Sequence, residues 1–395
     1  MSQTKLPDSN IIEKAIAPLR IQTLFVPQSQ PEPQSPPQKP VKVLPEVHSY
    51  HIPDGHRPTE DWYTHFKTLN CYCLVVTDGH GKHGRLAAQT ATEMVEEWTL
   101  QYTQQIPVWT SVELETEIEK LFSNIDALIC LKFVNLHSAN YNDNGVPRTQ
   151  FGDAIYGGTT LSCAWIFMKN GDRVCHVAHV GDSDMILMKK IEPTGEIKIE
   201  DLNERHKPET PGEYIRIQQL SIPYKAFPVY NQRHNRASSY YNPPVFHPLT
   251  PDNKTPQRIL YSATSPERLA QTTGNLSGIA ATYLVSPQGA PEKVVIAMTR
   301  SLGDYYAQQY GLTHIPSQKT IILDDSIDNI VVVASDGVWD MVRDRQIFAE
   351  EFFKKRKTDS LANCVRDIAE AAVANAEIAF GPENNDDTTV IVAQI

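Results

Sequence analysis

The sequence has no apolar run long enough to span a lipid bilayer, and its first twenty residues lack the apolar centre of a signal peptide. Its six cysteines form no Cys-x-x-Cys pair, so we expect neither a disulfide framework nor a zinc site. Together these absences predict a protein of the cytoplasm, or of the nucleus, that keeps its thiols reduced and does not contact a membrane.

Basic residues are scarce relative to acidic ones. The chain has 36 Lys and Arg against 47 Asp and Glu, which gives a formal net charge of −11. An acidic protein repels polyphosphates and anionic lipid headgroups, so nucleic acid is not an expected partner. Of the 395 residues, 41% are apolar, which is enough for one large core or two ordinary ones.

The N-terminal segment is poor in apolar residues. Residues 27–45 read PQSQPEPQSPPQKPVKVLP, and we expect residues 1–45 to form a disordered or extended arm. The arm contains Pro33-x-x-Pro36 and Pro37-x-x-Pro40, which suit a groove of the SH3 type, although the sequence favours a solvated tail. Residues 46–395 are then the folded domain.

Within that domain the sequence alternates between strand and helix patterns. Strands are predicted at 71–77, 159–168, 173–180, 184–190, 195–200, 293–299, 319–323, 329–335 and 388–395. Helices are predicted at 84–103, from Thr110 onward, and at 211–220, 343–356 and 360–379. Residues 221–290 show no period and are predicted to be a long irregular insertion. Short links such as Asn170-Gly171 favour hairpins, so we expect an α+β fold of antiparallel sheets covered by helices.

An acidic residue recurs where strands begin or end. Asp78, Asp182 and Asp336 each follow an apolar run, and the pair Asp386-Asp387 precedes the last one. Carboxylates that converge in a folded protein need compensating charge, and almost no Lys or Arg stands beside these acids in the sequence. Oxygen ligands alone suit Mg²⁺ or Mn²⁺, so the pattern indicates a divalent metal site.

A set of motifs appears in a fixed order along the chain. They are Asp78-Gly79-His80-Gly81, Gly157-Gly158-Thr159-Thr160, Val180-Gly181-Asp182-Ser183, His206-Lys207-Pro208 with Glu213 and Arg216-Ile217, Arg300-Ser301-Leu302-Gly303-Asp304, Ser335-Asp336-Gly337-Val338-Trp339-Asp340, and Asp386-Asp387-Thr388-Thr389-Val390-Ile391. This order resembles the metal-dependent protein phosphatases, the type 2C serine/threonine family, over residues 55–395. The resemblance implies two packed antiparallel sheets flanked by helices, with a dinuclear Mg²⁺ or Mn²⁺ centre at one end.

The resemblance also implies roles for individual residues. Asp78 would bridge the two metal ions, the Gly79 carbonyl would be a ligand, and Asp336 and Asp386 would complete the first ion's set, with Asp387 as the rival of Asp386. Glu60 and Asp61 would support the second ion. Arg57 would bind the phosphate, although it precedes Glu60 by three positions where the family has four, which leaves a solvated charge as the alternative.

Three further residues carry expectations with open alternatives. His80 would protonate the leaving oxygen, or else orient a metal-bound water. Asp182 and Asp340 would either hold a third ion or shape their loops by hydrogen bonds. We interpret the Gly157–Thr160 motif as turn packing, and Arg300 with Asp304 as an ion pair between loops.

The implied reaction is hydrolysis of phosphoserine and phosphothreonine in proteins by a hydroxide that two metal ions activate. Phosphorylated proteins are the expected partners, and we expect a monomer. One alternative is an inactive pseudophosphatase that acts as a scaffold. The other is a different metallohydrolase that acts on small phosphate esters.

Overall fold

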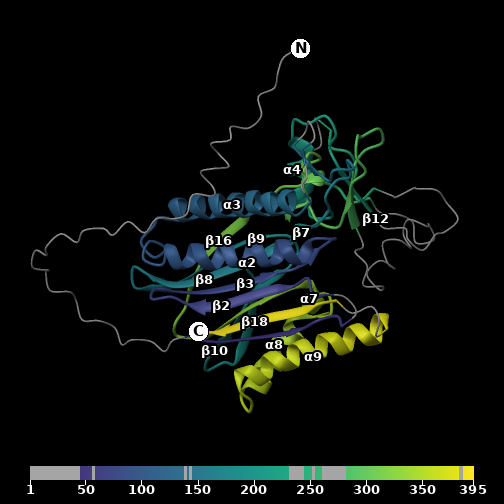
Figure 1. Ribbon diagram of the computed structural model, residues 1–395. Helices are drawn as coiled ribbons and strands as arrows, with labels where there is room; N and C mark the ends of the chain where they lie inside the picture. Colours follow the sequence, from purple (N-terminus) through teal and green to yellow (C-terminus); the bar gives the residue numbers. More distant parts are fainter. Residues whose placement is uncertain are drawn as a thin grey trace, which may run out of the picture. The chain divides into compact units, whose positions relative to one another are not determined.

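The computed structural model describes residues 45–55, 58–137, 140–141, 145–230, 244–250, 254–259, 282–381 and 386–395. The predicted arm at 1–45 lies outside this set except for its last residue, and so does Arg57. Within the set, two five-stranded antiparallel sheets stack face to face between two pairs of helices, which confirms the predicted fold class (Figure 1). No helix in these ranges is long and apolar enough to cross a membrane.

Each sheet is built from strands that are distant in the chain. The first has the order β16 (Ser317–Leu323), β9 (Asp172–Val180), β8 (Leu161–Lys169), β3 (Cys71–Thr77), β2 (Trp62–Lys67). The second has the order β1 (Glu46–Ile52), β18 (Thr388–Gln394), β17 (Asp328–Ala334), β10 (Asp184–Ile191), β11 (Glu196–Asp201). Helices α2 (Gly84–Gln101) and α3 (Ser111–His137) cover the first sheet, and α8 (Arg345–Arg356) and α9 (Leu361–Phe380) cover the second (Figure 1).

Alternation along β3 explains how one strand serves two cores. Cys73 and Val75 point toward the layer of α2 and α3, whereas Leu74 and Val76 belong to the core between the two sheets. All four are fully buried. Successive side chains of a strand face opposite sides, so a continuous apolar run fits a strand buried on both faces.

Local signals in the sequence fix several boundaries. The β8–β9 hairpin turns at Asn170 and Gly171, which both have positive φ, as a tight two-residue hairpin turn requires. Helix α3 begins after a reciprocal cap: the Thr110 amide donates to the Glu113 carboxylate, and the Glu113 amide donates to Thr110 Oγ1. Both features were predicted from the sequence.

The remaining elements are short. They are β4 (Gly79–His80), β5 (Asn140–Tyr141), β6 (Pro147–Arg148), β7 (Gly158–Thr159), α4 (Pro211–Gln219), β12 (Phe227–Tyr230), β13 (Thr282–Val285), β14 (Val295–Ile296), β15 (Leu302–Gly303), α6 (Tyr305–Gln308) and α7 (Asp336–Trp339). Strands β4, β7 and β15 form a small sheet of their own, and β12, β13 and β14 form another.

The structure differs from the sequence prediction in three places. Strands β1 and β2 were not predicted: each is an edge strand whose residues are mostly half-buried, so its hydrophobic pattern is weak. The strand predicted at 293–299 pairs only at β14, although Val294, Ile296 and Met298 are buried. The segment 221–290 is not irregular throughout, because β12 and β13 pair within it, and four-residue strands are too short to show a period.

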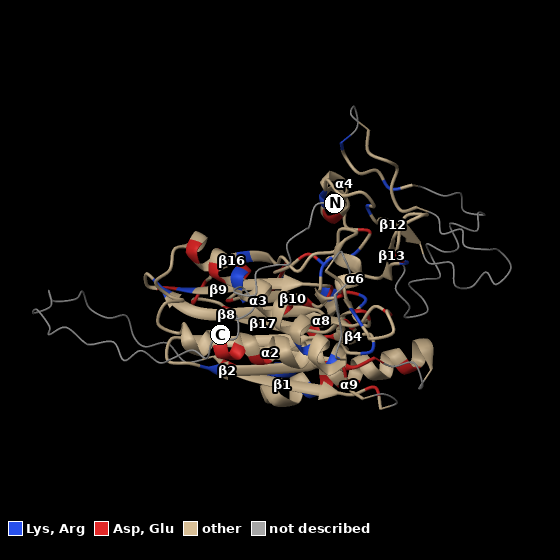
Figure 2. Cartoon of the chain, turned by 45° about the horizontal axis from the view of Figure 1, so that its top comes forward, with Lys and Arg blue, Asp and Glu red and all other residues tan. Residues whose placement is uncertain are grey.

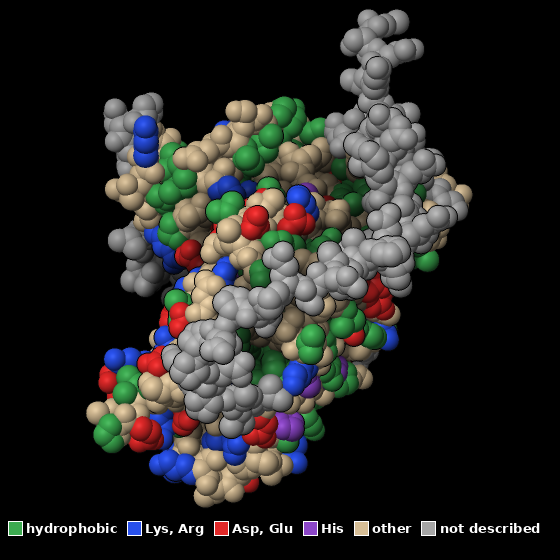
Figure 3. Space-filling view, turned by 90° about the vertical axis from the view of Figure 1, so that its left-hand side faces the viewer, with side chains coloured by type: hydrophobic (Ala, Val, Ile, Leu, Met, Phe, Trp, Pro, Cys, Tyr) green, Lys and Arg blue, Asp and Glu red, His purple; other side chains and the backbone are tan. Residues whose placement is uncertain are grey.

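The charged side chains are spread over the surface. On the face shown in Figure 3, acidic and basic side chains are interspersed among apolar and polar ones. The acidic balance of the chain is therefore not gathered in one patch among the coloured atoms of that face.

Leu74 tests the core between the sheets. We expect Leu74→Ala to lower the free energy of unfolding by about 2–5 kcal/mol, because the cavity lies between two packed sheets that cannot collapse onto it. Leu69→Ala is the matched control, since Leu69 is 80% exposed and Leu74 is fully buried; its effect should stay within about 0.5 kcal/mol. Equal effects in chemical denaturation would contradict the assignment of this core.

Candidate metal centre

The acids at the strand ends lie at one end of the stacked sheets. In the first sheet, β3 and β9 both run antiparallel to β8, so Asp78 and Asp182 follow them at the same edge. In the second sheet, β17 runs antiparallel to β18, so Asp336 after β17 comes beside Asp386 before β18. Helix α7, to the right in Figure 1, marks this end. Antiparallel topology thus gathers acids that are far apart in the sequence.

The carboxyl of Asp78 is at the centre of this acidic cluster. Burial raises its pKa. The charges of four other acids raise it further: Asp336, Asp61, Asp386 and Asp182. The pKa of Asp336 is likewise raised by burial and then by the charges of neighbouring acids, Asp182 and Asp386 among them. These carboxylates therefore lie close enough to repel one another.

The cluster fits a cation by its chemistry. Oδ1 of Asp182 is buried and accepts no hydrogen bond within the ranges that the structure describes. A buried carboxylate oxygen without a donor is costly, and hard divalent cations take such oxygens as ligands. Across those same ranges no three His, Cys, Asp or Glu side chains are already arranged as a ligand set. The case for a cation therefore rests on the gathering of negative charge and on one buried oxygen without a donor, and not on side chains that are already arranged to coordinate an ion.

Uncharged contacts hold Asp78 at its place. Its backbone carbonyl accepts from the Thr160 amide at 2.8 Å and from Thr159 Oγ1 at 3.0 Å, and its amide donates to Thr160 Oγ1 at 3.0 Å. Thr160 Oγ1 also lies 2.9 Å from Ser183 Oγ, next to Asp182. These contacts agree with our interpretation of the Gly157–Thr160 motif as packing that joins two acidic loops.

The backbone at Gly79 leaves no room for a side chain. A Cβ at this residue would lie 2.5 Å from the carbonyl carbon of Gly84 and 2.7 Å from the carbonyl oxygen of Glu60. The Gly79 amide donates to that same Glu60 oxygen at 3.2 Å. Glycine is thus required here to bring the chain between α2 and the segment that carries Glu60.

Asp386 and Asp387 have different environments. Asp387 is buried, and its carboxylate accepts hydrogen bonds from the Asp54, Glu60 and Asp61 amides and from Thr59 Oγ1. Asp387 therefore fastens the segment 54–61 to the start of β18. Asp386 is exposed, and its charge acts on Asp78 and Asp336. The carboxylate of Asp387 is thus engaged by four donors, and Asp386 stays the proposed ligand of the two.

The segment that carries Glu60 and Asp61 borders the acidic cluster. Asp61 is 3% exposed and accepts a hydrogen bond from Thr389 Oγ1 at 2.6 Å. Burial raises its pKa, and the charges of Asp387 and Asp386 also act to raise it. The charge of Glu60 acts on His80, so the two side chains are near each other. Arg57 lies outside the described residues.

His80 forms a pair with a second acid. Its Nε2 lies 2.6 Å from Oδ2 of Asp304, which is 1% exposed and also accepts from Ser301 Oγ at 2.7 Å. Burial acts to lower the pKa of His80, but the charge and hydrogen bond of Asp304 outweigh it, so the pKa is raised. The imidazole is thus held in place and favoured in its protonated form.

The two acids considered for a third ion each contact a cation of the chain. Lys207 Nζ lies 3.2 Å from Asp182 Oδ2, and Arg205 Nη1 lies 2.6 Å from Asp340 Oδ1. Burial acts to raise the pKa of Asp340, but the charges of Lys207 and Arg205 outweigh it and hold the pKa below its usual value. In Figure 2, basic and acidic segments alternate in the region of α6, α8 and β4. Each of these two acids thus already has one oxygen engaged by a cation of the chain.

Sequence reasoning missed the partners of several site residues. Arg300 binds Glu213 and not Asp304, and Asp304 binds His80, so the expected ion pair between Arg300 and Asp304 was wrong. The roles of Arg205 and Lys207 were also missed, although both adjoin His206 in a recognised motif. That adjacency was the available signal, but only the fold shows which acid each cation reaches.

Solved structures share this fold. A serine-threonine phosphatase 2C from Toxoplasma gondii superposes with a TM-score of 0.56 at 17% identity, covering 88% of this chain and 94% of that one. A sex determining protein of C. elegans gives a TM-score of 0.54 at 16% identity, covering 88% of this chain and 64% of that one. At these identities the likeness concerns the fold alone.

Two plant proteins are similar to this chain in sequence. Probable protein phosphatase 2C 73 of Arabidopsis thaliana is 24% identical over 273 residues, which are 69% of this chain and 58% of that protein. Probable protein phosphatase 2C 61 of the same plant is 26% identical over 319 residues, 80% of this chain and 73% of that protein. The chain therefore spans less than two thirds of the first of these relatives.

The fold and the acidic end of the sheets define a phosphatase-like sandwich. The family description "Protein phosphatase 2C" matches residues 82–235 and 268–378, which together make up more than half of the chain. The chain belongs to the protein phosphatase 2C family.

Substitution of Asp386 and Asp387 should separate an ion-binding role from a structural one. We expect Asp387→Ala to lower the free energy of unfolding by about 2–4 kcal/mol, because three amides and a hydroxyl lose their acceptor. Asp386→Ala should leave unfolding in EDTA nearly unchanged but weaken Mn²⁺ binding, measured by calorimetric titration. The assignment fails if Asp386→Ala is the destabilised variant and Asp387→Ala the one that keeps its fold but loses Mn²⁺ affinity.

Proposed function

We propose that this chain is a metal-dependent protein phosphatase that hydrolyses phosphoserine and phosphothreonine in proteins. The observation that carries the proposal is the gathering of Asp78, Asp336 and Asp386 at one end of the stacked sheets, where burial and then the charges of neighbouring acids, Asp386 among them, raise the pKa of Asp78 and of Asp336. Membership of the protein phosphatase 2C family supports it. The acids that a metal-dependent phosphatase needs are thus present at one end of the sheets, with Asp78 and Asp336 half-buried and Asp386 exposed.

The proposed ions are two Mg²⁺ or Mn²⁺. Asp78, Asp336 and Asp386 would hold them, with the Gly79 carbonyl, Glu60 and Asp61 as further oxygen donors. When bound, such a pair of ions lowers the pKa of water and neutralises the phosphoryl oxygens of a phosphate ester. The acids of this chain keep that charge fixed in a site whose backbone is held by neutral hydrogen bonds.

His80 is the proposed proton donor. Because Nε2 is held by Asp304, Nδ1 is the ring nitrogen that would donate to the departing serine or threonine oxygen. An alkoxide is a poor leaving group, so a proton supplied as the P–O bond breaks lowers the barrier. Asp304 keeps the imidazole oriented and charged for that transfer. Arg57 stays the proposed contact of the substrate phosphate.

The proposed substrates are phosphorylated proteins, and the proposed form is a monomer in the cytoplasm or nucleus. All six cysteines are free, and five of them are buried. Burial raises the pKa of thiols such as Cys71 and Cys163, which makes them poor nucleophiles. The thiols therefore fit a reducing compartment and take no part in the proposed reaction.

Divalent-dependent turnover tests the proposal. The full chain should hydrolyse a phosphothreonine peptide with Mn²⁺ or Mg²⁺, lose this activity in EDTA, and regain it when the ion is returned. Asp336→Asn should lower turnover roughly 100-fold or more, because it removes a ligand charge. No turnover by the folded wild type would favour a pseudophosphatase. Turnover of nucleotides or sugar phosphates but not of peptides would favour a metabolic hydrolase.

Thermal unfolding provides the control for Asp336→Asn. In EDTA this variant should melt at a higher temperature than the wild type, because it removes one charge from a set of mutually repelling carboxylates. Mn²⁺ should raise the melting temperature of the wild type more than that of the variant. A variant that is both inactive and less stable in EDTA would not support a metal-binding role for Asp336.

The pairing of His80 with Asp304 predicts a dependence on the leaving group. We expect Asp304→Asn to slow hydrolysis of a phosphothreonine peptide about 100-fold, and to slow hydrolysis of 4-nitrophenyl phosphate much less, since nitrophenolate departs without a proton. Asp126→Asn is the matched control: Asp126 is buried and accepts from the Gly303 amide next to Asp304, but Asp304 is the residue that accepts the hydrogen bond of His80. Equal losses on both substrates would mean that Asp304 is only structural.

A further inference from the structure

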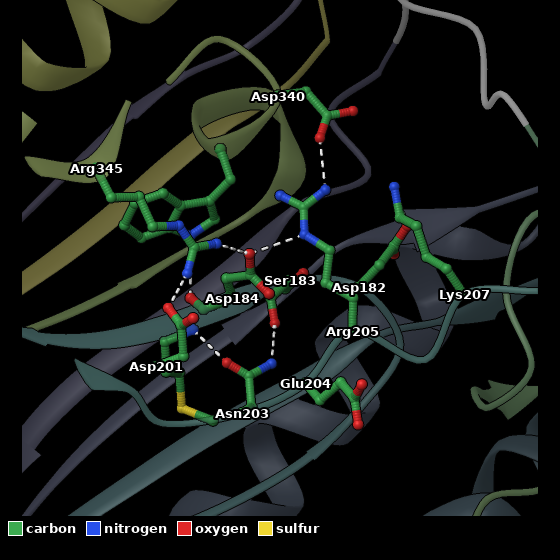
Figure 4. A network of polar contacts seen from close by, with 12 residues as sticks. Asp182, Ser183, Asp184, Asp201, Asn203, Glu204, Arg205, Lys207, Asp340 and Arg345 are labelled. Atoms are coloured by element: carbon green, nitrogen blue, oxygen red, sulfur yellow. Dashed lines mark hydrogen bonds and ion pairs between the residues drawn. The ribbon is translucent and has the colours of Figure 1, made fainter. Parts of the chain in front are cut away.

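One segment beside the acidic cluster brings two cations of its own. Arg205 and Lys207 lie in the segment between β11 and α4, and each contacts one of the acids considered for a third ion. Figure 4 shows Arg205 between Asp340 and Asp184, with Lys207 beside Asp182. The side chains of Arg205 and Lys207 are mostly buried, at 22% and 18% exposed.

Lys207 lies among three carboxylates. Its ammonium contacts Asp182 Oδ2 directly, and the charges of Asp340 and Asp336 also act on it. A third ion held by Asp182 and Asp340 would have to occupy this same region. The region already contains a positive charge that is attached to the chain.

Arg205 is anchored on its far side. Its Nε donates to Asp184 Oδ2 at 2.8 Å, while its Nη1 donates to Asp340 Oδ1 at 2.6 Å. Asp184 is 2% exposed and is also bound by Arg345, which in turn binds Asp201. The planar guanidinium thus bridges two acids in a fixed geometry, and a flexible cation would not.

The charges of these side chains equal that of one divalent ion. Lys207 supplies its positive charge to Asp182, and Arg205 shares its charge between Asp340 and Asp184. A further divalent cation would face two fixed positive charges and would have to break two ion pairs. Asp182 nevertheless keeps Oδ1 without a donor among the described residues, and its charge acts on Asp78, so this oxygen remains open to the two ions proposed beside Asp78.

We propose that Arg205 and Lys207 take the place of a third metal ion, so that this chain binds two divalent cations and excludes another. This inference rests on the proposed two-ion function, and it assigns Asp340 to the cations of the chain rather than to a metal. Arg205 and Lys207 are then positioning residues, which act on the site through Asp340 and Asp182.

Counting bound Mn²⁺ tests this inference. Equilibrium dialysis of the full chain against millimolar Mn²⁺, followed by metal analysis, should give two ions per wild-type chain. The double variant Arg205→Met with Lys207→Met should bind a third ion, because the acids it exposes keep their charge and lose their partners. Arg345→Met is the matched control and should stay at two, since Arg345 binds Asp184 and Asp201 but, among the described residues, forms no ion pair with Asp340.

The possible counts have distinct meanings. Three ions on the wild type would overturn the inference and leave the proposed phosphatase function standing, whereas none would overturn the metal centre itself. Two ions on a folded double variant would also overturn the inference. If the double variant does not fold, the single variant Asp340→Asn takes its place in the test. This variant should bind two ions, as the wild type does, and a lower count would show that Asp340 binds a metal.

Discussion

Mutual repulsion among buried carboxylates is the constraint on which the rest of this structure depends. Asp78 and Asp336 are buried enough for burial to raise their pKa, and each lies within the field of several other acids. Such a cluster is unfavourable by itself and persists only where the surrounding structure fixes it. Here the surroundings are two sheets with a closely packed core between them, which do not yield when the acids at their ends repel.

Two kinds of contact hold the acids, and they have different consequences. Asp78 is held through its backbone by Thr159 and Thr160, so its carboxylate takes no part in these hydrogen bonds. Asp340 is held through its carboxylate by a cation of the chain. The negative charge of Asp78 can therefore be balanced by an exchangeable ion, whereas the negative charge of Asp340 is already balanced by Arg205. The distinction between a ligand and a loop acid is therefore made by the neighbours and not by the residue type.

Most of the fold and part of the candidate site could be predicted from the sequence. Strand β3, the β8–β9 hairpin and the cap of α3 have strong local signals, and they lie where they were expected. The edge strands β1 and β2 have no such signal, because their side chains are only partly buried. Among the site residues, the acids stand out because each interrupts an apolar run. Asp304 and Arg205 do not stand out, because their importance lies in contacts 224 and 135 positions away in the chain.

A tethered cation differs physically from a bound ion. Arg205 is part of the chain and is held beside Asp340 by the fold, so its positive charge is present whether or not divalent ions are plentiful. An exchangeable ion, by contrast, is present in proportion to its free concentration and affinity. With Arg205 and Lys207 fixed, the charge around Asp340 and Asp182 stays constant while that around Asp78 follows the supply of metal. The outer part of the cluster is then permanently neutralised, and only the acids nearest Asp78 still need a metal ion for their charge to be balanced.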